Sequence, residues 1–455
     1  TCLVQYNSIW QIVRSGEITE RGGGDPDFTG LLMGGSVKES LSLEQILKAV
    51  KNAKTNDKIK GIYLKCEGVS AGFASLYEIR KALAEFREES KKPIYSYGYE
   101  SISQSDYYLA SAGDSIFVNP VGMVEVTGLA SMNMMFKDAL DKLGVEVQVV
   151  RVGTFKSAVE PYMLNEISEA NRMQQQHYMG NLWKEYVDGV CGSRGIQPET
   201  FNLYVDSILT FAPAEELMSK KLVDGICYKH EMEDKLRGMA GIGEDDDLNL
   251  VGPESLIESE KKPSESEIAV MYAEGEIDGR SSDGIDTEDY AKEILELAED
   301  DKVKALVLRV NSPGGSAFGS EQMWEALEQF KAKGKPFVVS MGDVAASGGY
   351  YISCGANRIF AEPTTITGSI GIFGTIPNLH KLATEKIGVN ISVVQTNENS
   401  NMLRSLFDKP LTPQQRAAMQ KYVNAGYELF TSRCAAGRGM SQDSIKAIAE
   451  GRVWD

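Results

Sequence analysis

The stretch DKIKGIYLK at residues 57–65 is matched by DKVKALVLR at residues 301–309, an offset of 244 residues. Further along, DYYLASAGDSIFVNP at 106–120 is matched by GYYISCGANRIFAEP at 349–363. Similarity that persists over so long a period indicates duplication of a whole domain and not a short solenoid repeat. The chain is therefore predicted to contain two divergent copies of one domain.

The predicted copies are residues 1–227 and 268–455, joined by residues 228–267. A length of 455 residues allows two to four domains, so two copies fit it. The joining segment contains GEDDDLN and ESEKKPSESE, a charged stretch with Pro and Ser that predicts a solvated acidic linker. The second copy stops at GRVWD, where the first continues through APAEELMSKKLVDGI, so its C-terminal end is expected to be truncated.

Strands and helices alternate within each copy. In the second copy, residues 305–310 (ALVLRV) are typical of a buried strand. A Gly-rich turn follows, and then a helix with Met323, Leu327 and Phe330 on one face. The next strand is expected at residues 336–341 (PFVVSM), again with a helix after it. This order predicts an α/β fold of βαβ units with a mostly parallel sheet.

Composition excludes several classes of function. The net charge of −18 argues against a nucleic-acid-binding protein, because phosphates would be repelled. The six cysteines form no C-x-x-C motif and there are only three histidines, so no metal site is predicted. A P-loop pattern is also missing, and no cofactor is expected. The chain begins with Thr1 and not Met, which suggests that a targeting or anchoring segment has been removed.

The two copies differ at the positions that carry reactive side chains. The second copy has NSPGGSA at 311–317 directly after a strand, where Gly314 and Gly315 let a substrate carbonyl approach main-chain N–H groups. It then has GDVAASGGYY, which places Ser347 at the start of a helix and the Gly348 N–H beside it. The loop and the serine together indicate a nucleophile with an oxyanion-binding site.

The first copy has lost this serine and carries a lysine of its own. Gln104 stands at the position of Ser347, whereas Lys156, in GTFKSAVEPY, is matched by Ser400 in the second copy. Each residue alone has a simpler explanation, since such a serine is commonly an N-cap and such a lysine a surface charge. Their complementary presence favours one site built from Ser347 and Lys156, formed either within a chain or between chains of an oligomer.

A Ser-Lys dyad fits the sequence better than a Ser-His-Asp triad. G-x-S-x-G is absent, and the three histidines lie in a Gln-rich helix (His177), in the linker region (His230) and in a polar stretch after Pro377 (His380). Lysine acts as a base only when neutral, and lowering its pKa from about 10.4 to near 7 requires about 4 to 5 kcal/mol of desolvation and local field. Lys156 is therefore expected to be buried. Ser369, in TGSIGIFG, is the predicted hydroxyl that orients it.

These motifs resemble those of the signal peptide peptidase SppA family (protease IV), in its long, duplicated bacterial form. The resemblance rests on NSPGG, AASGGYY and TGSIGIFG in one copy and GTFKSAVEPY in the other, and it covers nearly the whole chain. It implies that Ser347 is the nucleophile, Lys156 the general base and Ser369 the lysine-orienting serine. Gly348 and the Gly-rich loop would form the oxyanion region, in tandem domains of the Clp protease/crotonase-like fold.

The resemblance also implies a setting. The family forms a homotetramer anchored to the bacterial inner membrane by an N-terminal helix, with its catalytic domains facing the periplasm or the outside. Its substrates are cleaved signal peptides and other apolar peptides, which it hydrolyses through an acyl-enzyme. Two alternatives stay open at this point: a crotonase-like acyl-CoA thioester hydrolase, which would need a basic pocket for the CoA phosphates, and an inactive membrane-protein scaffold.

Overall fold

The computed structural model describes residues 4–21, 42–257, 264–279, 284–402 and 406–455. The chain forms two compact units, each built from separate parts of the sequence. The first unit comprises Thr1–Leu129, Asn181–Ser264 and Glu362–Thr364. The second comprises Ala130–Gly180, Glu265–Ala361 and Thr365–Asp455. The compact units thus have other boundaries than the two copies predicted from the repeat. The copies describe similarity in sequence, and the units describe packing.

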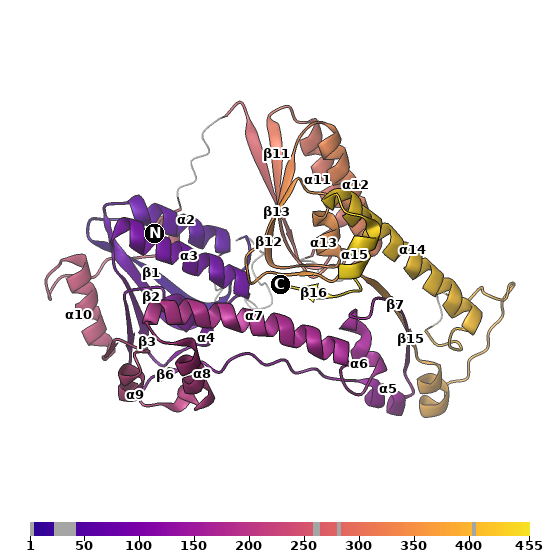
Figure 1. The fold of residues 1–455 in the computed structure, drawn as a ribbon, viewed down its shortest axis with the longest axis horizontal. Coiled ribbons are helices and arrows are strands. Elements are labelled where there is room, and N and C mark those ends of the chain that lie inside the picture. Colours follow the sequence, from indigo (N-terminus) through magenta and orange to yellow (C-terminus); the bar gives the residue numbers. More distant parts are fainter. Residues whose placement is uncertain (1–3, 22–41, 258–263, 280–283, 403–405) are drawn as a thin grey trace. The chain divides into compact units, whose positions relative to one another are not determined.

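The first unit contains a parallel sheet of six strands in the order β8-β5-β3-β2-β1-β9 (Figure 1). Its strands are β1 (Ser8–Glu17), β2 (Ile59–Ser70), β3 (Ile94–Gly98), β5 (Ser115–Val118), β8 (Gly225–Ile226) and β9 (Leu250–Val251). Two short strands, β4 (Ser101–Ile102) and β6 (Met123–Val124), pair with each other. Strand β2 contains the residues that open the repeat.

The helices of the first unit alternate with these strands along the sequence. They are α2 (Leu43–Thr55), α3 (Phe73–Ser90), α4 (Gln104–Ala110), α8 (Pro198–Asp206), α9 (Ala214–Ser219) and α10 (Lys229–Ala240), with 3₁₀ turns η2 (Leu209–Phe211) and η3 (Pro253–Ser255). The long helix α7 (Glu169–Arg194) contains the boundary between the two units. Among the described residues, no helix has an apolar stretch long enough to cross a membrane.

The second unit contains a sheet in the order β10-β11-β12-β14-β16, with β13 also paired to β12. Its strands are β10 (Glu267–Glu274), β11 (Val303–Ser312), β12 (Phe337–Ala346), β13 (Arg358–Phe360), β14 (Ile366–Gly368) and β16 (Val453–Trp454). All of these pairs are parallel except β14 with β16. The predicted α/β fold with a mostly parallel sheet is confirmed.

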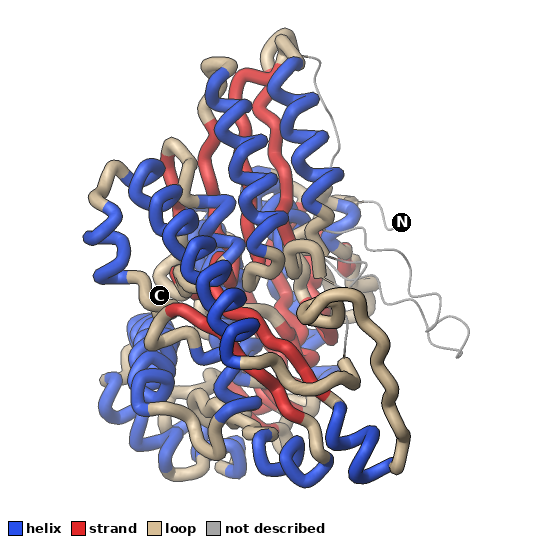
Figure 2. The backbone as a smooth tube through the Cα atoms, turned by 90° about the vertical axis from the view of Figure 1, so that its right-hand side faces the viewer, coloured by secondary structure: helices blue, strands red, loops and turns tan. Residues whose placement is uncertain are grey.

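The helices of the second unit follow the predicted strand–helix alternation, and Figure 2 shows helices running alongside strands. They are α5 (Lys137–Leu143), α6 (Glu160–Met163), α11 (Thr287–Glu299), α12 (Ala317–Ala332), α13 (Gly348–Ser353), α14 (Pro413–Arg438) and α15 (Gln442–Ile448), with a 3₁₀ turn η1 (Ser157–Val159) and a π-helical turn η4 (Leu382–Ile387). Met323, Leu327 and Phe330 of α12 are buried against the sheet, as their spacing predicts.

Two further strands connect the copies inside the second unit. Strand β7 (Glu146–Val152) comes from the first copy and β15 (Ile372–Asn378) from the second, and they pair antiparallel with Val152 opposite Ile372. The chain leaves β7 toward Lys156 and enters β15 from Ser369. Because paired strands are about 5 Å apart, this register brings the two predicted site residues to the same place.

Part of the predicted acidic linker is folded. Helix α10 buries Met232, Leu236 and Ala240 in a cluster with Ile9 of β1, so this part is not a solvated spacer. The apolar positions of KHEMEDKLRGMA recur at helical spacing and outweigh the charges between them. Residues 258–263, which carry part of the charged stretch, lie outside the described residues.

Candidate active site

Ser347 occupies a strained turn between a strand and a helix. Strand β12 ends at Ala346 and helix α13 begins at Gly348. Ser347 has φ 54° and ψ −116°, a backbone conformation that side-chain-bearing residues rarely adopt. Its N–H donates to Gly368 O at 2.9 Å and its carbonyl accepts from Tyr351 N at 2.9 Å. These two bonds hold the strained serine in place.

The Gly-rich loop after β11 lies directly against this turn. A Cβ on Gly314 would come within 2.6 Å of Gly348 N and 2.8 Å of Ser347 Cβ, so only glycine fits there. Gly314 also has φ 100°, which favours glycine. Its N–H donates to Ser312 Oγ at 3.2 Å, so Gly314 contributes space rather than a free donor.

Gly348 and Gly315 are the other two glycines predicted for the oxyanion region, and both line the pocket that contains Ser347. Gly348 is the first residue of α13, and the first N–H groups of a helix have no acceptor within the helix. The Gly348 N–H is therefore available to a ligand beside Ser347. Gly315 is held against Ile277, whose carbonyl accepts from Ser316 N at 2.9 Å.

Lys156 follows β7 and comes directly before the turn η1. Its side chain is only 4% exposed. The Nζ atom lies 3.1 Å from Ser347 Oγ. Burial lowers the pKa of this lysine to about 8, because the charged form loses its hydration. The sequence-based expectation of a buried lysine is thus met in the geometry.

Ser369 holds the lysine amine from the other side. Lys156 Nζ lies 2.9 Å from the Ser369 carbonyl oxygen and 3.0 Å from its Oγ. The Ser369 Oγ in turn donates to Gly451 O at 3.3 Å. Ser369 has φ 49°, so the site contains two non-glycine residues in the left-handed region. Backbone strain of this kind concentrates at functional sites.

All these residues belong to one chain and one compact unit. The sequence left open whether Ser347 meets Lys156 within a chain or between chains, and here they meet within one. A pocket of about 440 Å³ opens beside them. Its lining is largely apolar and includes Ile372, Phe373 and Phe430.

The corresponding place in the first copy is closed. Asp106 stands where the second copy has Gly349, and its carboxylate accepts from Gly68 N at 2.9 Å and Val69 N at 3.4 Å. The Gln104 side-chain oxygen accepts from Thr127 N at 3.1 Å and Gly128 N at 3.0 Å. The loop that would face a substrate is bonded to side chains of the protein instead.

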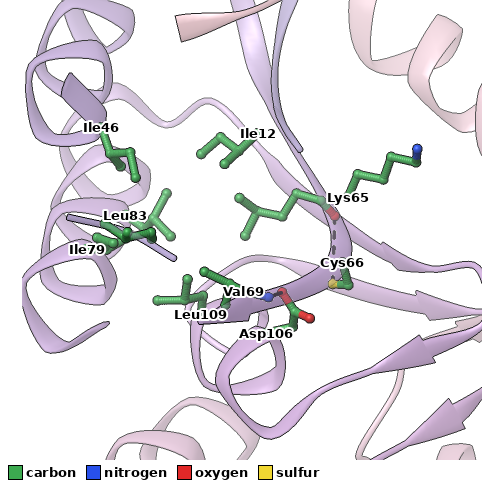
Figure 3. Close-up of a pocket in the computed structure, with 11 residues that line it drawn as sticks. Ile12, Ile46, Lys65, Cys66, Val69, Ile79, Leu83, Asp106 and Leu109 are labelled. Atoms are coloured by element: carbon green, nitrogen blue, oxygen red, sulfur yellow. Dashed lines mark hydrogen bonds between the residues drawn. The ribbon is translucent and has the colours of Figure 1, made fainter. Parts of the chain in front are cut away.

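Figure 3 shows a cavity of about 30 Å³ in the hydrophobic core of the first unit, with Val69 and Asp106 of this region at its edge. Ile12, Leu83 and Leu109 line it, Lys65 points away from it, and Asp106 closes it at the edge. Such a volume holds about one water molecule. This cavity is part of the core and is too small to hold a peptide.

Sequence reasoning missed the residues that hold the lysine loop, which we define as residues 153–157. They are Gln174 in α7 and Glu450 and Gly451 near the end of the chain. No local sequence pattern marks them, because they contact residues that are far away in the sequence. Within the described ranges, no cluster of three or more acidic, His or Cys side chains suited to a metal ion is found.

Comparison with known proteins identifies the class and then the family. The model named Clp protease matches residues 267–367, which agrees with the parallel βαβ fold. The model of peptidase family S49 matches residues 86–242 and 329–455. This chain belongs to peptidase family S49 and is a serine protease. One matched segment falls in each copy, in agreement with duplication.

Three relatives cover most of the chain. Protease 4 of Salmonella typhi is 38% identical over 424 residues, which is 91% of this chain and 68% of that protein. Protease 4 of Haemophilus influenzae is 36% identical over 439 residues, 93% of this chain and 70% of the relative. The chloroplastic serine protease SPPA of Arabidopsis thaliana is 30% identical over 460 residues, 98% and 66% respectively.

Proposed function

We propose that this serine protease is an endopeptidase with a Ser-Lys dyad, in which Ser347 is the nucleophile and Lys156 the general base. The observation that carries the proposal is the 3.1 Å distance between Ser347 Oγ and a lysine Nζ that is buried and has a pKa of about 8. A lysine with such a pKa is largely neutral in mildly alkaline solution, as a base must be.

The hydrogen bonds around the amine support this assignment. A neutral amine has two N–H donors and one lone pair. The Ser369 carbonyl can only accept, and the Ser369 hydroxyl donates to Gly451 O, so both accept from Lys156. The lone pair is then left for the Ser347 hydroxyl, which donates its proton to it.

The reaction is acyl transfer to water. Ser347 Oγ attacks the peptide carbonyl carbon as its proton passes to Lys156 Nζ. The Gly348 N–H stabilises the oxyanion, and the ammonium then protonates the departing amine. Water enters, gives a proton to Lys156 Nζ and attacks the ester carbon. When the second intermediate collapses, the bond from Ser347 Oγ to the acyl carbon breaks, the lysine proton passes to Ser347 Oγ, and the acid is released. Gly315 is the proposed second contributor to the oxyanion site, and Gly314 provides the space.

The proposed substrates are cleaved signal peptides and other apolar peptides. The pocket beside Ser347 supports this, because Ile372, Phe373 and Phe430 offer apolar surface to a side chain. The family resemblance adds a location: the bacterial inner membrane, through an N-terminal anchor, with the site facing the periplasm or the outside.

We also propose that the chain assembles with copies of itself, as the resemblance to a tetrameric family suggests. Strand β7, EVQVVRV, matches NISVVQT at residues 390–396 at the repeat offset of 244. In this chain β7 pairs with β15. Residues 390–395 form no strand and are exposed, with Val394 fully so.

The natural partner of residues 390–396 is the first copy's counterpart of β15. That counterpart lies just before α5, at about residues 129–134, and residues 130–134 are likewise exposed and outside any strand. Pairing these two segments between neighbouring chains would repeat the β7–β15 ladder. Such a contact joins different surfaces, and it generates a ring if the rotation closes.

A fluorophosphonate probe tests the nucleophile. We expect the wild-type protein to be labelled on the peptide that contains Ser347, and the Ser347→Ala variant to remain unlabelled. Ser432→Ala, which removes a half-buried hydroxyl that donates to Leu429 O within α14, is the matched control and should label normally. Labelling of Ser347→Ala at the wild-type rate would refute the assignment.

A further inference from the structure

The lysine loop is held by a turn from the far end of the sequence, residues 449–453, which we call the C-terminal turn. The Phe155 N–H donates to Glu450 O at 2.8 Å. The Glu450 carboxylate accepts from Thr154 N at 3.0 Å and from Thr154 Oγ1 at 3.1 Å. Three hydrogen bonds thus fix the backbone immediately before Lys156.

Gly451 lies against the lysine itself. It has φ 74°, and a Cβ at this position would come within 2.7 Å of both Lys156 N and Lys156 Cβ. The same residue binds Ser369, whose Oγ donates to Gly451 O, and Ser369 N donates to Arg452 O at 2.7 Å. The C-terminal turn therefore contacts both the lysine and the serine that orients it.

Gln174 of α7 links the lysine loop to the same turn. Its side chain is 2% exposed. Its Nε2 donates to Phe155 O at 3.2 Å and Ser157 Oγ at 2.9 Å, and its Oε1 accepts from Val453 N at 3.2 Å. A buried amide with partners for both its donor and its acceptor is well fixed. Gln174 therefore joins the two segments rigidly.

The charged groups nearby do not take the place of these contacts. Arg151 donates to Lys156 O at 3.1 Å, which is a backbone contact. The Arg452 guanidinium lies 5.4 Å from the centre of the Phe155 ring. Glu276 lines the pocket, and burial is the resolved cause of the shifted lysine pKa. The amine is thus placed by packing and by neutral hydrogen bonds.

We propose that Gly451 and Gln174 are positioning residues that hold the Lys156 amine within reach of the Ser347 hydroxyl. This inference rests on the proposed dyad. A buried lysine keeps its amine against Ser347 only if its backbone cannot retreat toward solvent. Gly451 fixes how close the C-terminal turn lies to Lys156, and Gln174 holds the residues before and after the lysine, Phe155 and Ser157.

Gly451→Ala tests the first contact. The added methyl group must displace Lys156, so we expect kcat for a peptide ester to fall by about 100-fold, as for a misplacement near 1 Å, with a small change in KM. The rise of kcat/KM on the acidic side of the pH profile (the acidic limb) should move to higher pH, because water that reaches the amine raises the lysine pKa. Gly439→Ala is the matched control, because Gly439 has φ 62° and nothing within 4 Å of the added Cβ. It should keep the wild-type profile.

Gln174→Ala tests the second contact without altering a glycine. We expect a fall in kcat of about 10-fold and an upward shift of the same acidic limb. Gln175→Ala is its control, since that neighbouring amide binds Asn133 and Asn171 and not the lysine loop. If Gln174→Ala only destabilised the fold and did not move the lysine, it would lower the amount of active enzyme but leave the acidic limb of the pH profile at the wild-type pH.

The outcomes separate the two proposals. Substantial hydrolysis by Ser347→Ala would refute the dyad itself. Suppose that Ser347→Ala is inactive but folded Gly451→Ala keeps the wild-type kcat and pH profile. That result would refute the role of Gly451 alone, and the same result in Gln174→Ala would refute the role of Gln174. If Gly451→Ala does not fold, Gln174→Ala decides, and an unshifted limb there overturns the inference.

Discussion

Lys156 Nζ lies 3.1 Å from Ser347 Oγ, although 191 residues separate the two in sequence. The chain closes this distance by pairing a strand from each copy, β7 and β15, inside one compact unit. Duplication therefore let one copy keep the lysine and the other keep the serine. The position equivalent to Ser347 in the first copy is Gln104, and the position equivalent to Lys156 in the second copy is Ser400, so both positions were free to change.

Replacement of Lys156 by methionine keeps the length of the side chain and removes the amine. We expect peptide hydrolysis to fall by at least about 1000-fold, the scale seen when one member of a catalytic unit is lost. The melting temperature should stay equal or rise, because a buried amine that prefers water is replaced by an apolar group. Thermal unfolding and a peptide-ester assay measure both effects. Retention of a tenth of the activity would contradict the assignment.

The pH dependence of activity follows from the lysine pKa of about 8. Lys156, the proposed base, works only when neutral, so kcat/KM should rise with pH and level off above about 8. A pH profile measured with a neutral peptide substrate checks this. A profile with its acidic limb near pH 4 to 5 would instead indicate a carboxylate base.

Stability should depend on pH in the same direction. The lysine pKa is lower in the folded state than its ordinary value of 10.5, so between about pH 8 and 10.5 the unfolded chain binds more protons. The destabilisation is fully present below about pH 8 and is relieved as pH rises, by roughly 3 kcal/mol at most. Other groups also titrate in this range, so the quantity to measure is the difference in unfolding free energy between wild type and Lys156→Met.

Much of this site could be predicted from sequence, because the repeat shows which residues each copy has lost. The strands around Ser347 follow from β-branched runs, and the helix after it from the alternation of strands and helices. The lysine loop's partners could not be predicted. Gly451 acts through its backbone, and the Gln174 amide bonds residues far away in the sequence, so no local pattern reveals either. Helix α10 was hidden in the acidic linker because its apolar residues are few, yet Met232 and Leu236 suffice to anchor it.

The first copy should not regain activity from a single serine. Gln104→Ser, combined with Ser347→Ala, restores a hydroxyl at the equivalent place but supplies neither a lysine nor free loop N–H groups. The Asp106 carboxylate still accepts from Gly68 N and Val69 N. We expect no hydrolysis and no fluorophosphonate labelling at residue 104. Labelling there would show that the first copy's place is more open than its hydrogen bonds indicate.

Assembly should depend on the exposed segment at residues 390–396. Val394→Asp places a charge on a fully exposed valine, which costs nothing in an isolated chain but opposes strand pairing with a neighbour. Light scattering should show a smaller particle for this variant. Val121→Asp is the matched control, because Val121 is 88% exposed and belongs to neither proposed segment. Equal particle sizes for wild type and both variants would contradict assembly through this strand.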